Sequence, residues 1–413
     1  MFSGYMTLFR TPGALRFSIP GLIARMPISM DSLALIFIVV AASDSYALAG
    51  ALSATASAVM ACATPYWSRV ADRIGQSAML VRVIPIKVAG LSLFTFLVLN
   101  QAPTWTWFGS IIIAESMSVN TGGLVRRRWL HVLSPDKTST AEDEQDRHLV
   151  NTAYSFEAIM DEIVFILGPI IVTACATTIA PAAGIISGII FVAIGVPLFV
   201  AQKSTEPPAT PKRSVDPHPA VIRNRRVQAV VLVTTLLGGF FGSIAIVTIA
   251  FADQRGQEGK SGILLAVWAF GSGIAAIING AIKWKISITS RFLLFLFALT
   301  LVTIPMLFVH SLVWLAVALF FNGFAIAPLV INAYGVAEGS VPAEQITETL
   351  TWVVAGMPLG GAISSALSGQ VIDRFGADIA FWVPLGFMIA ACAATLPYFN
   401  TYKALIGYPR ARD

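Results

Sequence analysis

Long apolar stretches alternate with short polar links along almost the whole chain. Because a helix needs about 20 apolar residues to cross a bilayer, this pattern predicts twelve membrane-spanning helices, placed near residues 17–41, 45–67, 79–99, 104–125, 151–175, 182–201, 228–251, 262–282, 291–309, 312–334, 348–371 and 379–398. Two prolines and two charged residues make the first span irregular, namely Pro20, Arg25, Pro27 and Asp31. Such interruptions are tolerated only beside protein or a water-filled cavity. The expected fold class is therefore an all-α membrane protein.

The composition agrees with this expectation. With 56% hydrophobic residues, 12% charged residues and a mean hydropathy of +0.77, the 413-residue chain has too little polar surface to coat a soluble globule. The 27 Lys and Arg exceed the 22 Asp and Glu, but the cations lie in separate links and form no single basic face. We therefore expect a lipid bilayer as partner and no nucleic acid. Cys62, Cys175 and Cys392 show no metal-binding spacing, so no metal site is expected.

Positive charge is distributed unequally between the two sets of links. If the N-terminus lies in the cytoplasm, the outer links carry only Arg255, Lys260 and Arg374, and the inner links carry most of the other cations. The positive-inside rule then places both termini in the cytoplasm. No small-residue cleavage pattern follows the first apolar run, so this run is expected to be an uncleaved span.

Residues 202–227 form the longest polar stretch and are rich in proline and charge. Such a composition is typical of an extended linker. The stretch divides the predicted spans six and six. The predicted domains are an N-terminal six-helix bundle at 1–201, a cytoplasmic linker at 202–227 and a C-terminal six-helix bundle at 228–413.

The tetrapeptide Asp-Arg-x-Gly occurs twice, as Asp72 to Gly75 and as Asp373 to Gly376. Charged residues at a helix end are expected at the membrane boundary, and glycine permits a tight turn there. The first copy follows an even-numbered predicted span and the second an odd-numbered one, so the copies should lie on opposite sides of the membrane. Only Asp72 is then a candidate for a cytoplasmic gate, whereas Asp373 is expected in an outer turn.

Residues 68–77, Ser-Arg-Val-Ala-Asp-Arg-Ile-Gly-Gln-Ser, resemble the signature Gly-x-Leu-Ala-Asp-Arg-x-Gly-Arg-Lys of the major facilitator superfamily. With six spans, a central loop and six more spans, the resemblance covers essentially the whole chain. It implies the major facilitator fold of two six-helix bundles, a transporter, and gating by Asp72, Arg73 and Gly75. A Gln-Ser pair replaces the usual basic pair, so the contacts that those cations make in relatives are not expected.

Three other segments, Leu8 to Gly13, Phe156 to Glu162 and Thr347 to Trp352, resemble a group of poorly characterised bacterial members of that superfamily. This resemblance implies the cytoplasmic (inner) membrane of a bacterium. Gly168-Pro169 also resembles the Gly-Pro of the antiporter motif in proton-coupled drug exporters, and residues 356–361 are similarly rich in glycine. These small residues allow either tight helix packing or a hinge.

Charges within the predicted spans are concentrated in the N-terminal half, which holds Arg25, Asp31, Arg82, Lys87, Glu115, Glu157, Asp161 and Glu162. Each charge in mid-bilayer costs about 3 kcal/mol or more, so it needs a partner, a cavity or a proton. Glu157 and Asp161 share one helix face, and Glu162 turns away from it. Two carboxylates close together cannot both stay ionised cheaply in a low dielectric, which makes this face a candidate proton site. The alternative is ion pairing with Arg25, Arg82 or Arg128.

Asp31 and Glu115 lie on the first and fourth predicted spans, which face the central cavity in this superfamily. They are therefore candidates for both proton coupling and substrate binding, and Glu162 completes the proton candidates. The other substrate-binding candidates are polar or aromatic, namely Asn120, Asn322, Trp352, Phe240, Phe241 and Trp268, with Phe321 as a further apolar position. The aromatic residues could instead serve packing or interfacial anchoring. Arg25 is a candidate gating residue, with a structural counter-ion as the alternative.

No motif in the sequence indicates an enzyme, a cofactor or ATP-driven transport. The expected function is secondary active transport of a small molecule across the cytoplasmic membrane by alternating access, as proton-coupled efflux by a monomer. Two alternatives stay open. One is proton-independent uptake or facilitated diffusion of a sugar or metabolite, and the other is a non-transporting membrane sensor or scaffold on a transporter fold.

Overall fold

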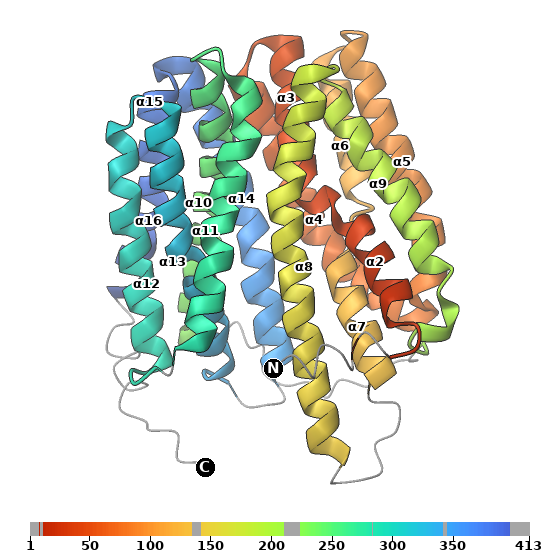
Figure 1. The fold of residues 1–413 in the computed structure, drawn as a ribbon. Helices are drawn as coiled ribbons and strands as arrows, with labels where there is room; N and C mark the ends of the chain where they lie inside the picture. The colour runs from red at the N-terminus through yellow and green to blue at the C-terminus, as the bar shows by residue number, and fades with distance from the viewer. Residues whose placement is uncertain are drawn as a thin grey trace. The chain divides into compact units, whose positions relative to one another are not determined.

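The computed structural model describes Leu8 and residues 11–133, 142–209, 224–282, 284–341 and 345–396. Every regular element in these ranges is a helix (Figure 1). The α-helices are α2 (Ala14–Arg25), α3 (Pro27–Ser43), α4 (Tyr46–Ile74), α5 (Gln76–Leu99), α6 (Thr104–Glu115), α7 (Thr121–Leu133), α8 (Glu142–Thr178), α9 (Ala183–Val200), α10 (Arg225–Asp253), α11 (Ser261–Ala281), α12 (Ile288–Thr303), α13 (Leu312–Glu338), α14 (Ile346–Phe375), α15 (Ala377–Ala380) and α16 (Trp382–Thr395). Short 3-10 segments are η1 (Lys203–Thr205), η3 (Glu258–Lys260) and η4 (Ile304–Phe308).

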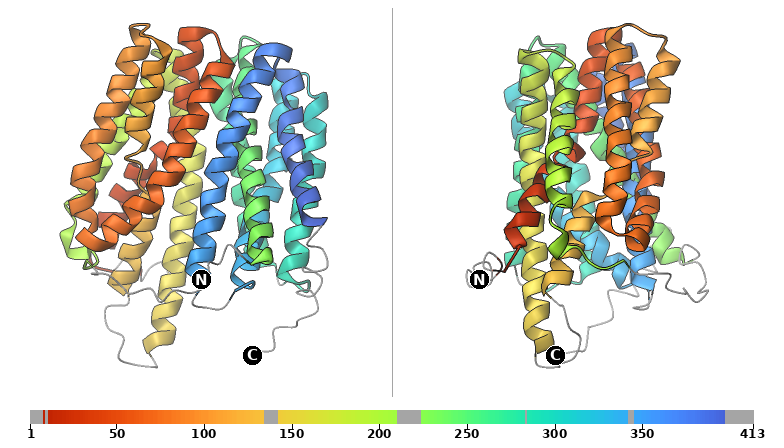
Figure 2. Two further views of the ribbon diagram at one scale, coloured as in Figure 1. Left: turned by 180° about the vertical axis from the view of Figure 1, so that it is seen from behind. Right: turned by 90° about the vertical axis from the view of Figure 1, so that its right-hand side faces the viewer.

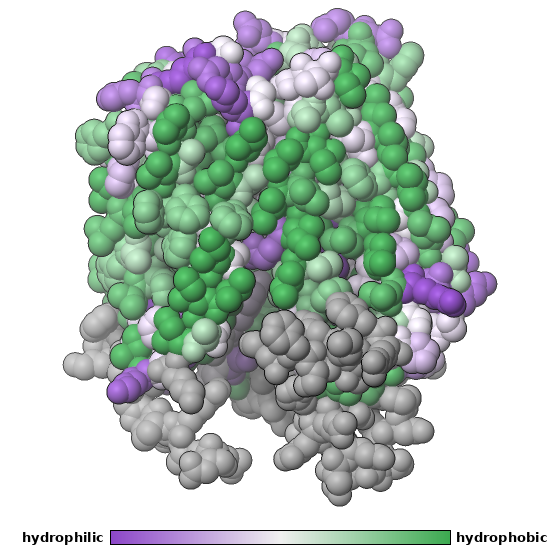
Figure 3. Space-filling model, viewed as in Figure 1, coloured by the Kyte–Doolittle hydropathy of each residue, from purple (hydrophilic) through white to green (hydrophobic). Residues whose placement is uncertain are grey.

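The apolar pattern of the sequence predicted the approximate positions of these helices. Within the described ranges, ten segments are long and apolar enough to cross a membrane. The predicted spans 104–125 and 348–371 correspond to α6 with α7 and to α14. The all-α membrane fold is thus confirmed, while the number of twelve crossings stays a prediction. Hydrophobic side chains cover most of the lateral face seen in Figure 3, as expected of a surface that contacts lipid.

Contacts between helices divide the described chain into two units. The N-terminal unit contains α2, α3 up to Ile38, the part of α4 from Cys62 onward, and α5 to α9. The C-terminal unit contains the end of α3 from Val39 onward and the first part of α4, up to Ala61, together with α10 to α16. Two helices, α3 and α4, therefore contribute residues to both units. The predicted linker lies partly outside the described residues, and its boundaries stay a prediction.

The first predicted span consists of two helices, α2 and α3, which meet at Met26. Pro27 begins α3, where a proline is tolerated because the first N–H groups of a helix have no intrahelical partner. Close packing against α9 holds this region, since a Cβ at Gly195 would overlap the backbone of Ala24. The charged end of α2 is thereby buried inside the N-terminal unit.

The predicted span 104–125 differs from expectation because it is not one continuous helix. α6 ends at Glu115 and α7 begins at Thr121. The next helix, α8, is by contrast one continuous helix (Figure 2). Polar side chains stabilise the break: Asn120 Oδ1 accepts the Gly123 N–H at 3.0 Å, and Trp67 Nε1 donates to the Ser116 carbonyl at 2.7 Å. Asn and Ser side chains compete with the helical backbone for hydrogen bonds, which favours a break here.

In the C-terminal unit, α10 and α14 pack backbone to backbone. A Cβ at Gly238 would overlap the Met357 carbonyl, and one at Gly360 would overlap the Thr235 carbonyl. Small residues at a membrane helix interface allow this close approach. The glycine-rich segment of α14 therefore serves tight packing in this structure, and a hinge role stays a prediction.

Candidate functional site

Arg25 lies at the centre of the first buried charge cluster. It forms ion pairs with both Glu157 and Asp161 on α8, the latter at 2.9 Å. Asp161 also pairs with Arg126 on α7 at 2.5 Å. We call Arg25, Arg126, Glu157 and Asp161 the Arg25 network. Its two cations and two carboxylates balance, so it needs no further ion.

Glu157 is the most deeply buried member of this network, with no exposed surface. Its Oε1 accepts the Ser18 hydroxyl at 2.8 Å and the Trp129 indole N–H at 2.6 Å, while Oε2 faces Arg25. The carboxylate thus joins α2, α7 and α8. Of the predicted alternatives for this acidic face, the geometry favours ion pairing, and the partner is Arg25 and not Arg82 or Arg128.

Glu162 lies beside Asp161 but does not join the Arg25 network. It makes no hydrogen bond or ion pair with any residue that the structure describes, and its side chain is partly exposed. This agrees with its predicted position away from the shared face of Glu157 and Asp161. Its proton role stays a prediction.

A second buried charge cluster joins three helices of the N-terminal unit. Lys87 Nζ on α5 lies 3.4 Å from Asp31 Oδ2 on α3 and 3.4 Å from Glu115 Oε2 at the end of α6. Ser118, in the break after α6, accepts from Lys87 at 3.0 Å and donates to Glu115 at 2.5 Å. We call these four residues the Lys87 cluster.

The Lys87 cluster holds one cation and two carboxylates, so with all groups ionised it carries one net negative charge. Its side chains are poorly exposed, at 6% for Glu115, 11% for Lys87 and 31% for Asp31. The absence of a side chain at Gly188 makes room for Asp31, since a Cβ there would lie 3.3 Å from its Oδ1. Burial makes the unbalanced charge costly and favours uptake of one proton or another cation.

Asp31 and Glu115 were predicted from the sequence as site residues, whereas Lys87 and Ser118 had no predicted role. The sequence shows Lys87 as an embedded charge, but it does not show that its partners lie on two other helices. Asn120, the next candidate along the chain, is exposed at the break and its side chain caps α7. The break therefore brings Glu115, Ser118 and Asn120 into one short segment.

Several substrate candidates of the C-terminal unit form one aromatic cluster. The rings of Phe240, Phe241 and Trp268 have centroids 5.6 to 6.1 Å apart. Trp268 Nε1 donates to Asn322 Oδ1 at 2.9 Å, and Asn322 Nδ2 donates to Thr303 Oγ1 at 3.0 Å. Asn322 is fully buried and satisfied by these bonds, whereas Phe241 and Trp268 remain partly exposed.

Trp352 does not join this aromatic cluster. It lies on α14, is 41% exposed, and makes no hydrogen bond or ring contact with residues that the structure describes. An exposed indole on a membrane helix is also compatible with an interfacial anchor. Its binding role stays a prediction.

The first Asp-Arg-x-Gly copy lies at the junction of α4 and α5. Asp72 forms an ion pair with Arg127 on α7, and Arg73 is exposed. Gly75 has a φ of 91°, a conformation that glycine adopts without strain. Asp72, Arg73 and Gly75 therefore lie together, whereas Arg25, the fourth gating candidate, belongs to the Arg25 network. The gating roles stay predictions.

The second copy contacts the opposite end of α4. Asp373 accepts the Tyr46 N–H at 2.8 Å, the Ala47 N–H at 2.9 Å and the Ser45 hydroxyl at 2.8 Å. Tyr46 in turn donates its hydroxyl to Asp253 at 2.8 Å. Asp373 is thus a helix cap and not only part of a turn. The two copies of the tetrapeptide lie at the two ends of α4.

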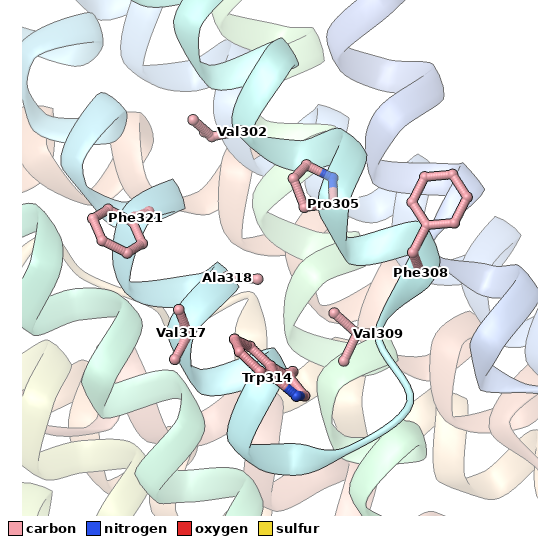
Figure 4. Close-up of a pocket in the computed structure, with 8 residues that line it drawn as sticks. All are labelled: Val302, Pro305, Phe308, Val309, Trp314, Val317, Ala318 and Phe321. Carbon is pink, nitrogen blue, oxygen red and sulfur yellow. The ribbon is translucent and has the colours of Figure 1, made fainter.

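The C-terminal unit also has an apolar pocket of about 360 Å³ beside α12, η4 and α13. Figure 4 shows the side chains of Val302, Pro305, Trp314 and Phe321 around it. Phe308, at its edge, is 71% exposed. Its lining offers no charged side chain, and among the residues considered above only Phe321 takes part. The one polar side-chain group of its lining is the indole N–H of Trp314, so the pocket offers no charge to bind an ionised substrate group.

Comparison with known proteins agrees with this architecture. The family model described as Major Facilitator Superfamily matches residues 231–412. A mutant of the nucleoside transporter NupG has a similar fold, with a TM-score of 0.72 and 16% identity over 93% of this chain and 99% of that chain. A POT family transporter in complex with a thioalcohol conjugated peptide has a TM-score of 0.71 and 13% identity over 96% of each chain.

The human organic anion transporter MFSD10 is a further structural relative, with a TM-score of 0.61 and 13% identity over 93% of this chain and 100% of that chain. These identities are low, so the likeness shows the fold. No curated protein matches the sequence. The C-terminal part of the chain thus matches the model of the major facilitator superfamily, and the chain as described has the fold of these transporters, that of a multi-pass membrane protein.

Proposed function

We propose that this protein exports an amphipathic small molecule in exchange for protons, by alternating access across the inner membrane of a bacterium. Both termini would lie in the cytoplasm, as the distribution of Lys and Arg predicts. The protein would act as a monomer. The likeness of Gly168-Pro169 to the antiporter motif supports the outward direction.

The observation that carries proton coupling is the charge balance of the two buried clusters. The Arg25 network is neutral with every group ionised, so proton uptake there would break existing ion pairs. The Lys87 cluster has one carboxylate more than it has cations, and a proton would neutralise it. Among the proton candidates, we therefore favour the pair Asp31 and Glu115 over Glu157 and Asp161.

The two carboxylates of the Lys87 cluster would share this proton as a coupled pair, because both face the same ammonium group. Glu157 and Asp161 would hold α2, α7 and α8 together. The partly exposed rings of Phe241 and Trp268 would provide apolar contacts for the substrate. Asn120 at the helix break would supply a polar contact.

A substrate is first sought by thermal shift against metabolites and drugs, because a ligand that binds the folded state raises its stability. Its flux is then measured in proteoliposomes under an imposed pH gradient. We expect Asp31→Asn with Glu115→Gln to abolish the dependence of flux on the gradient. The matched comparison is Glu157→Gln with Asp161→Asn, which should lower stability yet leave gradient dependence in the protein that remains folded.

Gradient-driven flux that survives Asp31→Asn with Glu115→Gln would refute the assignment of the proton site. Saturable flux that is insensitive to a protonophore in the unmodified protein would instead indicate facilitated diffusion or uptake of a metabolite. No saturable flux of any solute would indicate a sensor or scaffold.

A further inference from the structure

The first residues after α9 form a compact contact with the start of α5. The chain turns through η1 (Lys203–Thr205), and Thr205 is buried, with only 3% of it exposed. Glu206 follows, and its two carboxylate oxygens accept the Ser77 N–H at 2.7 Å and the Ser77 hydroxyl at 2.5 Å. These contacts lie at the beginning of the stretch that composition marks as a linker.

The position of Glu206 is chemically favourable. Ser77 lies in the first turn of α5, where backbone N–H groups have no intrahelical acceptor and the helix dipole favours a negative charge. A Cβ at Gly75 would lie 3.0 Å from Glu206 Oε1, so glycine leaves room for the carboxylate. Glu206 therefore supplies the acceptor and the charge that this helix start needs.

Arg128 holds the same contact from α7. Its Nη1 donates to the Gln202 carbonyl at 2.8 Å and to Thr205 Oγ1 at 3.2 Å, and its Nε donates to Gln76 Oε1 at 2.9 Å. The guanidinium also lies 3.8 Å from the centre of the Phe199 ring. One fully buried arginine thus binds both sides of the contact.

We infer that Glu206 is a positioning residue for the first Asp-Arg-x-Gly turn. Together, Gln76, Ser77, Arg128, Thr205 and Glu206 form what we call the Glu206 clamp. By fixing the first turn of α5, the clamp holds the preceding turn so that Asp72 stays opposite Arg127. The Gln-Ser pair, unlike a basic pair, provides an acceptor for Arg128 and a small hydroxyl for Glu206.

This inference does not depend on proton coupling, and it can be tested without a substrate. Hydrogen–deuterium exchange of the purified full-length protein is measured over residues 71–80. We expect Glu206→Ala to accelerate exchange of the Ser77 amide by roughly 10- to 100-fold, as for loss of a hydrogen bond to a charged group. Exchange of the amides in the Asp72 turn should rise as well.

Three variants make this test specific. Lys203→Ala is the matched control, because Lys203 is exposed in the same segment and its side chain has no polar contact with the described residues. Glu206→Gln keeps one acceptor but loses the charge, so it should give an intermediate rate and also serves if Glu206→Ala fails to fold. Ser77→Ala combined with Glu206→Ala should show less than additive effects, because both changes remove the same hydrogen bond, from the Ser77 hydroxyl to Glu206.

The inference is overturned if Glu206→Ala and Glu206→Gln leave exchange over residues 71–80 unchanged. It is also overturned if exchange rises equally throughout the N-terminal unit, since this would indicate general destabilisation without a specific effect on the motif. Confinement of the change to the start of α5 and the Asp72 turn would support it.

Discussion

Replacement of Arg25 by Met tests whether the Arg25 network is an energetic unit. Met fills much of the space of the arginine stem but removes the charge that pairs with Glu157. Glu157 has no exposed surface, and its remaining partners, Ser18 and Trp129, are neutral. Asp161, in contrast, keeps its ion pair with Arg126. The variant therefore leaves one uncompensated carboxylate in the core.

Removal of one member of a buried ion pair costs about 3–5 kcal/mol, and we expect Arg25→Met to destabilise the protein by this amount at neutral pH. Adding Glu157→Gln removes the stranded charge and keeps an acceptor for Ser18 and Trp129. The double variant should therefore be more stable than Arg25→Met alone, with a remaining loss of about 1 kcal/mol from the missing hydrogen bonds.

The pH dependence gives an independent check on Arg25→Met. A buried carboxylate without a partner binds a proton more readily in the folded state than in the unfolded state. The folded state then gains stability relative to the unfolded state as pH falls. The destabilisation of Arg25→Met should accordingly shrink at acid pH, whereas the double variant with Glu157→Gln should lack this component.

The free energies of unfolding are measured in mixed micelles by titration with sodium dodecyl sulfate and followed by tryptophan fluorescence. Arg82→Met serves as the control, since Arg82 is exposed and makes no polar contact with described residues. It should change stability by no more than about 0.5 kcal/mol. A double variant as unstable as the sum of its two single variants would refute the reasoning, because the two residues would then be independent.

Three further predictions concern the C-terminal unit. Gly360→Ala should destabilise it by about 1–3 kcal/mol in thermal unfolding, because the added Cβ overlaps the backbone of α10. Gly386→Ala, which has open space at its Cβ, should be nearly neutral. Equal effects of the two substitutions would contradict this prediction. Asp373→Ala should cost about 0.5–2 kcal/mol and accelerate exchange of the amides that it caps in α4, and unchanged exchange would exclude the cap. Asn322→Leu should cost about 1–3 kcal/mol by leaving the Trp268 N–H without its acceptor, and a neutral effect on thermal unfolding would show that this bond is replaced.

The features that could be predicted from the sequence are those that depend on residues close together in the chain. The spacing of Glu157 and Asp161 placed both on one face because four residues make slightly more than one helical turn, and both carboxylates do contact Arg25. The positions of the helices followed from apolar length in the same way. The break between Glu115 and Thr121 was missed, because residues 104–125 are apolar enough for a continuous helix.

The site required information that is distant along the chain. Lys87 meets Asp31 and Glu115 only because three helices converge, and no local pattern shows which embedded charge pairs with which. The contact of Glu206 with Ser77 joins residues 129 positions apart. Glu206 was predicted from composition to lie in a linker, because a stretch rich in proline and charge indicates exposure to solvent. Such a composition does not reveal a specific contact.

The sequence by itself determined that this chain is a helical membrane protein, because the cost of exposing backbone and charge to lipid leaves few alternatives. It also determined which spans contain ionisable groups. The tertiary structure decided how these charges are divided into a neutral Arg25 network and a Lys87 cluster with one excess carboxylate. That division depends on which helices pack together, and helix packing is set by burial and close contact across the whole fold and not by the period of any one helix.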